Sequence, residues 1–279
     1  MRSRSILGLN PKGFHRLHYT EWGSPGDPTI VCVHGLSQNA RSFDALAQTL
    51  SAAHHVVCLD VVGRGQSGWL KDPAGYTYPQ YLADANVLIA RLGVDRIDWI
   101  GTSMGGLIGI MLAAMENSPI RRLVINDVGP FVPKAALERI GAYMSQDNRF
   151  ADLAAFETHL REVYAPFGPL SDDQWRRMAT LGARKNEDDS ISPSYDPAIA
   201  NAFCQGPLMD VDLWPVWDAI SCPTLVLRGT QSDILLAETA AEMTQRGPRA
   251  SVVEFAGIGH APALQAGDQI AAIRGFVNA

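Results

Sequence analysis

The 279-residue chain lacks the features that mark several broad classes of protein. It has no run of about eighteen apolar residues, which a membrane-spanning helix needs. Its first residues, MRSRSILGLNPKGFH, contain no long apolar stretch and no small-residue cleavage site, so no secretory signal is predicted. The formal net charge of -6, with scattered Lys and Arg, gives no attraction to nucleic acid or anionic lipid. We therefore expect a cytoplasmic protein that binds neither nucleic acid nor a membrane.

Cysteine is also scarce. The chain has four cysteines, none of them in a C-x-x-C pair or at a Cys/His spacing suited to zinc: Cys32, Cys58, Cys204 and Cys222. Two of them, Cys32 and Cys58, lie in apolar runs, where a small thiol packs as a hydrophobic side chain. We expect structural roles for all four and no metal site.

Short apolar segments alternate with longer helical patterns along most of the chain. Segments such as TIVCVH, VVCLD and TLVLR are almost continuously apolar, which is typical of strands covered on both faces. This alternation predicts one α/β domain with a parallel sheet and crossover helices. The expected strands are 15–22, 29–34, 56–60, 97–101, 122–126, 224–228 and 252–255, and the expected helices include 43–50, 78–92, 104–115 and 268–277.

The alternation stops between residues 130 and 215. This interval is expected to contain helices only, because apolar residues recur at helical spacing in AALERIGAYM, DLAAFETHLREVY and DDQWRRMATLGARK. It falls between two expected strands of one sheet, so we interpret it as an inserted helical cap. The predicted division is a core of residues 1–129 and 216–279 with a cap of residues 130–215.

A glycine motif of the form G-x-G-x-x-G follows the expected strand 56–60, at Gly63, Gly65 and Gly68. In a dinucleotide-binding site such glycines open a helix whose N-terminal amides hold the pyrophosphate. Here the next residues, WLKDPAGYTYP, contain two prolines and a glycine and cannot form that helix. The acidic residue about twenty positions later, Asp84, falls inside a helical pattern. We therefore interpret the motif as a turn.

A second turn has the features of a nucleophile site. The apolar strand that ends near Ile100 runs into the segment GTSMG, and a helical pattern follows at once. A G-x-S-x-G turn between a strand and a helix lifts the serine hydroxyl clear of the sheet. The following helix directs its N-terminal amides toward developing negative charge. The sequence therefore predicts Ser103 as a nucleophile.

A serine nucleophile needs a base and an acid that orients the base. Of the seven histidines, His260 fits best, because it lies in the loop GIGHAPAL after an expected strand near the chain end. The predicted acid is Asp233, in the loop after strand 224–228, because it gives the chain order Ser, Asp, His. Asp127, directly after strand 122–126, is the alternative, since an acid on the neighbouring strand could also reach the imidazole.

Two backbone amides are expected to form an oxyanion hole. The Met104 N–H, next after the nucleophile, is one predicted donor. The second is assigned to the Leu36 N–H, in the segment HGLS after the strand TIVCVH. His34 is expected to shape this segment through hydrogen bonds of its side chain.

Aromatic residues of the expected cap are candidates for an apolar substrate pocket, although most aromatic residues at helical spacing pack into a core. The principal candidates are Phe131, Trp175 and Trp214, and the others are Tyr164, Phe167, Tyr195, Phe203 and Trp217.

These segments together resemble the α/β-hydrolase superfamily over essentially the whole chain. The matching pieces are VHGLSQNARSF, DVVGRGQSG, IGTSMGG, RGTQSD and GIGHAPAL, in that order. The resemblance implies an eight-stranded, mostly parallel sheet, a helical lid and no cofactor. It also identifies the first glycine motif as the turn after the superfamily's fourth strand. In one departure, the acid loop GTQSD is one residue longer than the common G-x-x-D, which keeps Asp127 open as the acid.

We predict a serine hydrolase that cleaves carboxylic esters of small to medium acyl groups through an acyl-enzyme. A serine at the turn argues against the dehalogenase and epoxide-hydrolase branches, which are similar but use a carboxylate there. Lactonases, carbon–carbon bond hydrolases and a slow-turnover receptor that retains the triad stay open. A small-molecule ester is the expected partner, and the protein is expected to be a monomer or a homodimer. For a carbon–carbon bond hydrolase, the cap offers four cations for a substrate carboxylate: Arg139, Arg149, Arg161 and Arg176.

Overall fold

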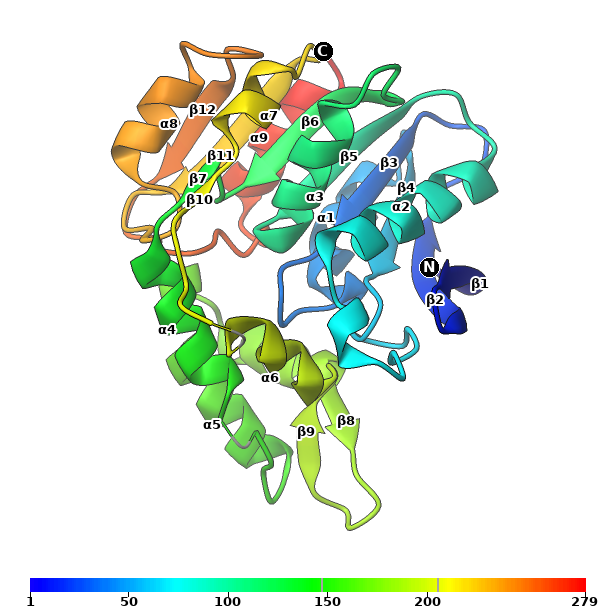
Figure 1. The fold of residues 1–279 in the computed structure, drawn as a ribbon, viewed down its shortest axis with the longest axis vertical. Coiled ribbons are helices and arrows are strands. Elements are labelled where there is room, and N and C mark those ends of the chain that lie inside the picture. The colour runs from blue at the N-terminus through cyan, green and yellow to red at the C-terminus, as the bar shows by residue number, and fades with distance from the viewer. Residues whose placement is uncertain (147, 205) are drawn as a thin grey trace.

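An eight-stranded sheet forms the centre of the molecule in the computed structural model, which describes residues 1–146, 148–204 and 206–279 (Figure 1). The strands follow the order β1-β2-β4-β3-β5-β6-β11-β12 across the sheet. The pairs β1–β2 and β2–β4 are antiparallel, and the other pairs are parallel. This confirms the predicted α/β fold with a mostly parallel sheet. The strands are β1 (Arg2–Asn10), β2 (Gly13–Trp22), β3 (Thr29–Val33), β4 (His55–Asp60), β5 (Ile97–Thr102), β6 (Ile120–Asn126), β11 (Thr224–Gly229) and β12 (Ser251–Phe255).

The central strands are buried along their whole length, as their apolar sequences predict. Every residue of β3, β4, β5 and β11 is buried, and Cys32 and Cys58 face each other in register on neighbouring strands. The edge strand β1 was not among the expected strands, because most of its residues are exposed and give no apolar face to detect. It forms because a tight turn ending at Gly13, with φ 123°, folds it back onto β2.

Helices cover both faces of the sheet, which is how a mostly parallel sheet buries its two apolar faces. Apolar side chains of α1 and α9 pack against one face, and those of α2, α3 and α8 pack against the other. The helices of this layer arrangement are α1 (Asp44–Leu50), α2 (Tyr78–Leu92), α3 (Met104–Ala113), α8 (Ala237–Met243) and α9 (Gly267–Val277), with short 3-10 helices η1 (Ala40–Phe43) and η2 (Pro73–Gly75).

Most of the chain between β6 and β11 extends away from the sheet in Figure 1, and residues 130–215 of it are called the insertion below; its last helix, α7, continues beyond residue 215 and packs against the core. The expectation that the insertion contains helices only is wrong. Its helices are joined by two small antiparallel sheets, one that pairs the two ends of the insertion and one hairpin. Its elements are β7 (Phe131–Val132), α4 (Lys134–Met144), α5 (Leu153–Val163), η3 (Ala165–Phe167), α6 (Asp172–Gly182), β8 (Ala183–Lys185), β9 (Ile191–Pro193), η4 (Pro197–Phe203), β10 (Val211–Asp212) and α7 (Trp214–Asp218).

The extra strands escaped prediction for a physical reason. Each is only two or three residues long, too short to show an apolar period. The helix predicted through ARK ends at Gly182, and the polar segment 186–190 then reverses the chain into the hairpin. The division of the chain into a core of residues 1–129 and 216–279 and an inserted cap of residues 130–215 stays a prediction.

The first glycine motif is a turn, which confirms that interpretation. Gly63 and Gly65 have φ values of 84° and 55°, and the motif is followed by η2 before α2 begins. Asp60 fastens the turn to the sheet, because its carboxylate accepts the backbone N–H groups of Ala40 and Gln66 at 2.7 and 2.9 Å.

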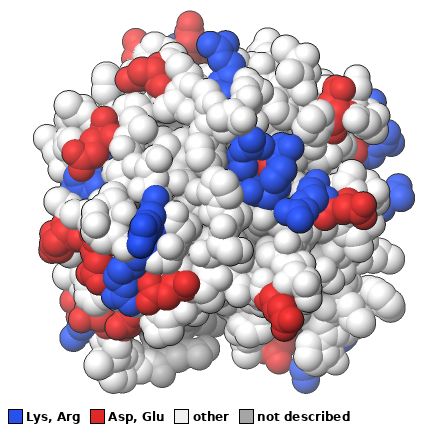
Figure 2. Space-filling model, turned by 90° about the horizontal axis from the view of Figure 1, so that it is seen from above, with Lys and Arg blue, Asp and Glu red and all other residues white. Residues whose placement is uncertain are grey.

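Acidic and basic residues lie interspersed on the face shown in Figure 2, and neither sign forms one extended patch there. Among the helices of the described residues, none combines the length and the apolar character that crossing a bilayer requires.

Candidate active site

Ser103 lies in a strained turn between β5 and α3. Its backbone has φ 51° and ψ -115°, a region that few residues other than glycine adopt. The flanking glycines make this turn possible. A Cβ on Gly101 would lie 2.2 Å from Gly105 O, and one on Gly105 would lie 2.0 Å from Val33 O. The G-x-S-x-G spacing is therefore a packing requirement that brings strand and helix together around an outward-facing Ser103.

His260 and Asp127 complete a row of hydrogen bonds with Ser103. Ser103 Oγ lies 2.9 Å from His260 Nε2, and His260 Nδ1 lies 2.8 Å from Asp127 Oδ2. The Asp127 side chain is fully buried and also accepts hydrogen bonds from the Gly229 N–H and the Ser232 hydroxyl, at 2.8 and 2.6 Å. These bonds hold the carboxylate toward the imidazole. Three side chains far apart in the sequence therefore meet at the carboxyl ends of β5, β6 and β12.

Asp233 does not contact His260, so the acid predicted first is wrong in this respect. Its side chain is 49% exposed and accepts two hydrogen bonds from Arg139 of α4, at 2.5 and 3.0 Å. In the loop after β11 it is Ser232, one residue earlier, that points to Asp127. Asp127, the alternative acid, occupies the position beside the imidazole.

His34 holds the loop that carries Leu36, as expected. The Val61 N–H donates to His34 Nε2 at 3.0 Å, so the neutral ring carries its proton on Nδ1 and donates it to Gly35 O at 2.7 Å. The side chain is completely buried, and this burial lowers the pKa of His34 from 6.5 to about 4. A Cβ on Gly35 would lie 3.6 Å from Ser103 Cβ, so the loop passes directly beside the serine.

The depressed pKa of His34 predicts that acid destabilises the protein. The unfolded chain binds a proton at this ring near pH 6.5, and the folded chain binds one only near pH 4. The stabilisation is therefore fully present above pH 6.5 and is lost as the pH falls toward 4. From this group alone, we expect the free energy of unfolding, measured in urea, to fall by about 2 kcal/mol between pH 7 and pH 5.

The matched variant is His34→Asn, which removes the titration. Its free energy of unfolding should change with pH by about 2 kcal/mol less than that of the wild type over the same interval. Equal pH dependences in the two proteins would contradict a neutral, buried His34.

Arg64 was not singled out from the sequence, yet it braces both predicted oxyanion residues. Its guanidinium is completely buried and donates to Leu36 O at 3.0 Å and, more weakly, to the sulfur of Met104 at 3.5 Å. It also lies over the Tyr81 ring, 5.1 Å from the centroid, and within the described residues it forms no ion pair. A buried cation without a carboxylate partner favours negative charge nearby. No sequence pattern distinguishes such an arginine from a solvated one in a turn.

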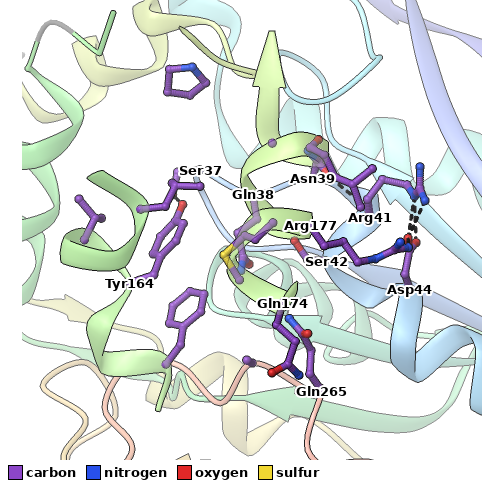
Figure 3. Close-up of a pocket in the computed structure, with 18 of the residues that line it drawn as sticks. Ser37, Gln38, Asn39, Arg41, Ser42, Asp44, Tyr164, Gln174, Arg177 and Gln265 are labelled. Atoms are coloured by element: carbon purple, nitrogen blue, oxygen red, sulfur yellow. Dashed lines mark hydrogen bonds and ion pairs between the residues drawn. The ribbon is translucent and has the colours of Figure 1, made fainter. Parts of the chain in front are cut away.

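Two adjoining cavities lie between the sheet and the insertion. The smaller, of about 40 Å³, is lined by Ser103, His260 and Leu36. The larger, of about 250 Å³, is lined by residues such as Gln38, Tyr164 and Arg177 (Figure 3), and Ser103 is not among its described lining residues. The wall between them is made of residues that line both: Ser37, Gln38, Tyr143, Val163, Tyr164 and Phe167.

The principal aromatic candidates for the substrate pocket are wrong, because none of them lines either cavity. Trp175 packs in an apolar cluster inside the insertion, Trp214 lies against Arg246, and Phe131 pairs in the small sheet β7–β10. Tyr164 and Phe167 line both cavities instead. Helical spacing shows that an aromatic residue is on an inward face, but it does not show which inward space that face meets.

The four cap arginines proposed for a substrate carboxylate all have acidic partners. Arg139 lines the smaller cavity but is held by Asp233, and the others lie in exposed ion pairs. The remaining pairs are Arg149 with Asp188, Arg161 with Glu157 and Asp172, and Arg176 with Asp173.

A second Ser–His–Asp row occurs at the edge of the sheet. Ser3 Oγ lies 2.6 Å from His18 Nε2, and His18 Nδ1 lies 2.7 Å from Asp60 Oδ2. Ser3 belongs to the extended strand β1, so it has neither a strained turn nor a helix N-terminus beside it. The row of Ser3, His18 and Asp60 therefore has no helix N-terminal amides beside it to stabilise an oxyanion. Across the described residues, no cluster of three His, Cys, Asp or Glu side chains is placed to bind a metal ion.

Comparison with known protein families identifies a match over most of the chain. The model of the alpha/beta hydrolase fold family matches residues 28–266. Among solved structures, an alpha/beta hydrolase from Novosphingobium aromaticivorans is 39% identical, with a TM-score of 0.89 and coverage of 99% of this chain and 98% of that one.

Two curated relatives have named activities. A 3-hydroxybutyrate-oligomer hydrolase of Cupriavidus necator is 44% identical over 272 residues, covering 94% of this chain and 93% of the relative. A 2-(acetamidomethylene)succinate hydrolase of Mesorhizobium japonicum is 26% identical over 245 residues, covering 88% and 84%. Both relatives are similar to this chain over most of their length.

Proposed function

We propose that this chain, which belongs to the α/β-hydrolase family, is a serine hydrolase that cleaves carboxylic esters, and that short oligoesters of 3-hydroxybutyrate are its favoured substrate class. The observation that carries the proposal is the row of hydrogen bonds from Ser103 through His260 to Asp127, at 2.9 and 2.8 Å. The identity to the oligomer hydrolase of Cupriavidus necator supports the substrate class.

In the proposed acylation step, Ser103 Oγ attacks the ester carbonyl while His260 Nε2 takes its proton. His260 then gives that proton to the oxygen of the leaving alcohol. Asp127 accepts a hydrogen bond from His260 Nδ1, which keeps the ring in the tautomer with a free Nε2 and stabilises the imidazolium. Water activated by His260 then releases the acid from Ser103.

The oxyanion is assigned to the backbone amides of Leu36 and Met104. Met104 is the first residue of α3, whose N-terminal amides have no acceptor within the helix. Within the described residues, neither amide donates a hydrogen bond to another group, so both are free for a substrate oxygen. Arg64 supports this arrangement by holding the carbonyl of Leu36 and contacting the side chain of Met104.

Two kinds of substrate test the proposal on the purified protein. We expect release of p-nitrophenol from p-nitrophenyl butyrate and of monomer from the linear dimer of 3-hydroxybutyrate, with turnover in the ordinary range of roughly one per second or more. The Ser103→Ala variant serves as the control for background hydrolysis. Turnover below roughly one per minute on every ester would contradict an esterase and favour a receptor.

A further inference from the structure

The larger cavity is not used by the chemistry described so far. At about 250 Å³ it exceeds the 40 Å³ cavity at Ser103, so it offers space for the part of a larger substrate that the smaller cavity cannot hold. It is enclosed on one side by the segment from Ser37 to α1 and on the other by α5 and α6 of the insertion. Its lining includes side-chain amides such as Gln38 and Gln174, which can bind ester oxygens.

The charged side chains that line this cavity include more cations than anions. Arg41 donates to Asp44 from Nε and Nη2, at 2.9 and 2.6 Å, and Arg177 donates to the same carboxylate at 2.5 Å. Figure 3 shows these three side chains converging at one end of the cavity. Two guanidinium groups thus share one carboxylate of the cavity lining, while Asp60, outside the lining, attracts Arg41 electrostatically.

No other acidic side chain lines the cavity in the described part of the chain. Among the described lining residues, the other ionisable side chains are tyrosines and His159, whose pKa is lowered by burial. Arg139 at the smaller cavity differs, because Asp233 balances it one to one. The arginine pair at Asp44 is therefore the better site for an anionic group of a substrate.

The cation pair and the nucleophile lie on opposite sides of the shared wall. Ser37 Oγ lies 2.8 Å from Tyr164 OH in that wall, and Ser37 directly follows the predicted oxyanion residue Leu36. In Figure 3 the Ser37–Tyr164 pair lies on the left and the Arg41–Asp44–Arg177 group on the right, with Gln38 between them. A chain-like substrate that leaves Ser103 past this wall would point its far end at the arginines.

We infer that the larger cavity binds the carboxylate-bearing unit of an anionic oligoester, with Arg177 and Arg41 holding the carboxylate. The inference rests on the proposed function and fixes the direction of the substrate. In a linear oligoester of a hydroxy acid, the unit that bears the free carboxylate is on the alcohol side of the scissile bond. A bond therefore forms between Ser103 Oγ and the acyl carbon, the ester C–O bond breaks, and the proton from Ser103 passes through His260 to the departing hydroxy acid.

The test compares two forms of the 3-hydroxybutyrate dimer, the free acid and its neutral dimethylamide, by chromatography of the products. In the wild type we expect kcat/KM for the free acid to exceed that for the amide by about tenfold, as for a partly exposed charge-assisted contact. Arg177→Gln should remove most of this preference, mainly through KM. The matched control is Arg176→Gln on the same helix, whose side chain lines neither cavity, and it should keep the preference.

The Asp44→Asn variant tests whether Arg41 and Arg177 bind the substrate carboxylate or only hold the fold together. It breaks the same ion pairs but leaves both cations, so it should keep or increase the preference for the free acid. Equal losses on both substrates in Arg177→Gln and Asp44→Asn would mean that the cluster only fastens α6 to α1, and the inference would fall. It would also fall if the wild type cleaved both forms equally well, with the proposed ester hydrolysis intact. A wild type that cleaves no ester, p-nitrophenyl butyrate included, would overturn the proposed function and the inference with it.

Discussion

Replacing Ser103 with alanine is expected to lower kcat for p-nitrophenyl butyrate by about a million-fold, because the variant loses the atom that forms the acyl-enzyme. The Ser103 hydroxyl lies on a backbone turn with φ 51° and contacts His260 Nε2 at 2.9 Å. No other hydroxyl is expected to take over this position. Residual hydrolysis would come from binding and from the oxyanion amides.

The control for this prediction is Ser3→Ala. Ser3 lies in a hydrogen-bonded row with His18 and Asp60 that has the same order of residue types as the candidate site. It differs in lying on an exposed edge strand without a helix N-terminus, so the variant should keep wild-type kcat within about twofold. If Ser3→Ala were inactive and Ser103→Ala active, the nucleophile would be Ser3 and not Ser103, which would contradict the assignment.

Asp127→Asn is expected to lower kcat by about ten-thousand-fold while the protein stays folded. An amide in place of the carboxylate can donate to His260 Nδ1, which favours the tautomer whose proton sits on Nε2 and blocks proton transfer from Ser103. The amide also fails to stabilise the imidazolium. The measurement is kcat on p-nitrophenyl butyrate together with urea unfolding, since Asp127 also accepts bonds from Gly229 and Ser232.

Asp233→Asn is the matched control for the acid. Asp233 is half exposed, and Arg139 is its only ion-pair partner among the described residues, so the substitution should change kcat by no more than a few-fold. A reversed result, with Asp233→Asn inactive and Asp127→Asn active, would mean that the loop after β11 adopts another arrangement during turnover.

For these two acids, the sequence predicts the edge of the sheet at which they lie but not which of them contacts His260. Asp127 and Asp233 follow neighbouring parallel strands, β6 and β11, so both are predicted to lie at the same edge of the sheet. Which one faces His260 depends on single side-chain directions in the loop after β11, where Ser232 points inward and Asp233 does not. Long apolar patterns predict which segments form strands, but the side-chain directions in the loop of residues 230–236 are decided by local hydrogen bonds.

The motif-bearing residues were predictable because their chemistry requires a local backbone shape. Ser103 needs glycines on either side at fixed spacing, and His260 needs a loop directly after a strand. The lining of the cavities was not predictable in this way. Trp175 and Phe167 are both aromatic residues of the insertion, yet of the two only Phe167 lines the cavities, because Trp175 packs in an apolar cluster with residues of α5 and α6.

The charge balance of the larger cavity also arises from tertiary contacts alone. Arg41 lies in η1 and Asp44 in α1, whereas Arg177 lies in α6 of the insertion. Within the sequence, Arg41 and Asp44 look like a common pair three residues apart on a solvated surface. Arg177 likewise gives no sign of a buried partner. Only the approach of α6 to α1 places a second guanidinium on one carboxylate.

The central claim is that an acyl group is carried by one serine, and rapid mixing with p-nitrophenyl butyrate tests it most directly. The account predicts an initial burst close to one p-nitrophenol per protein chain when deacylation is slower than acylation, with the butyryl group located on Ser103 by mass spectrometry of the quenched protein. The burst and the mass shift should both be absent from Ser103→Ala. A butyryl group found on another residue, or a burst of undiminished size in Ser103→Ala, would contradict the account.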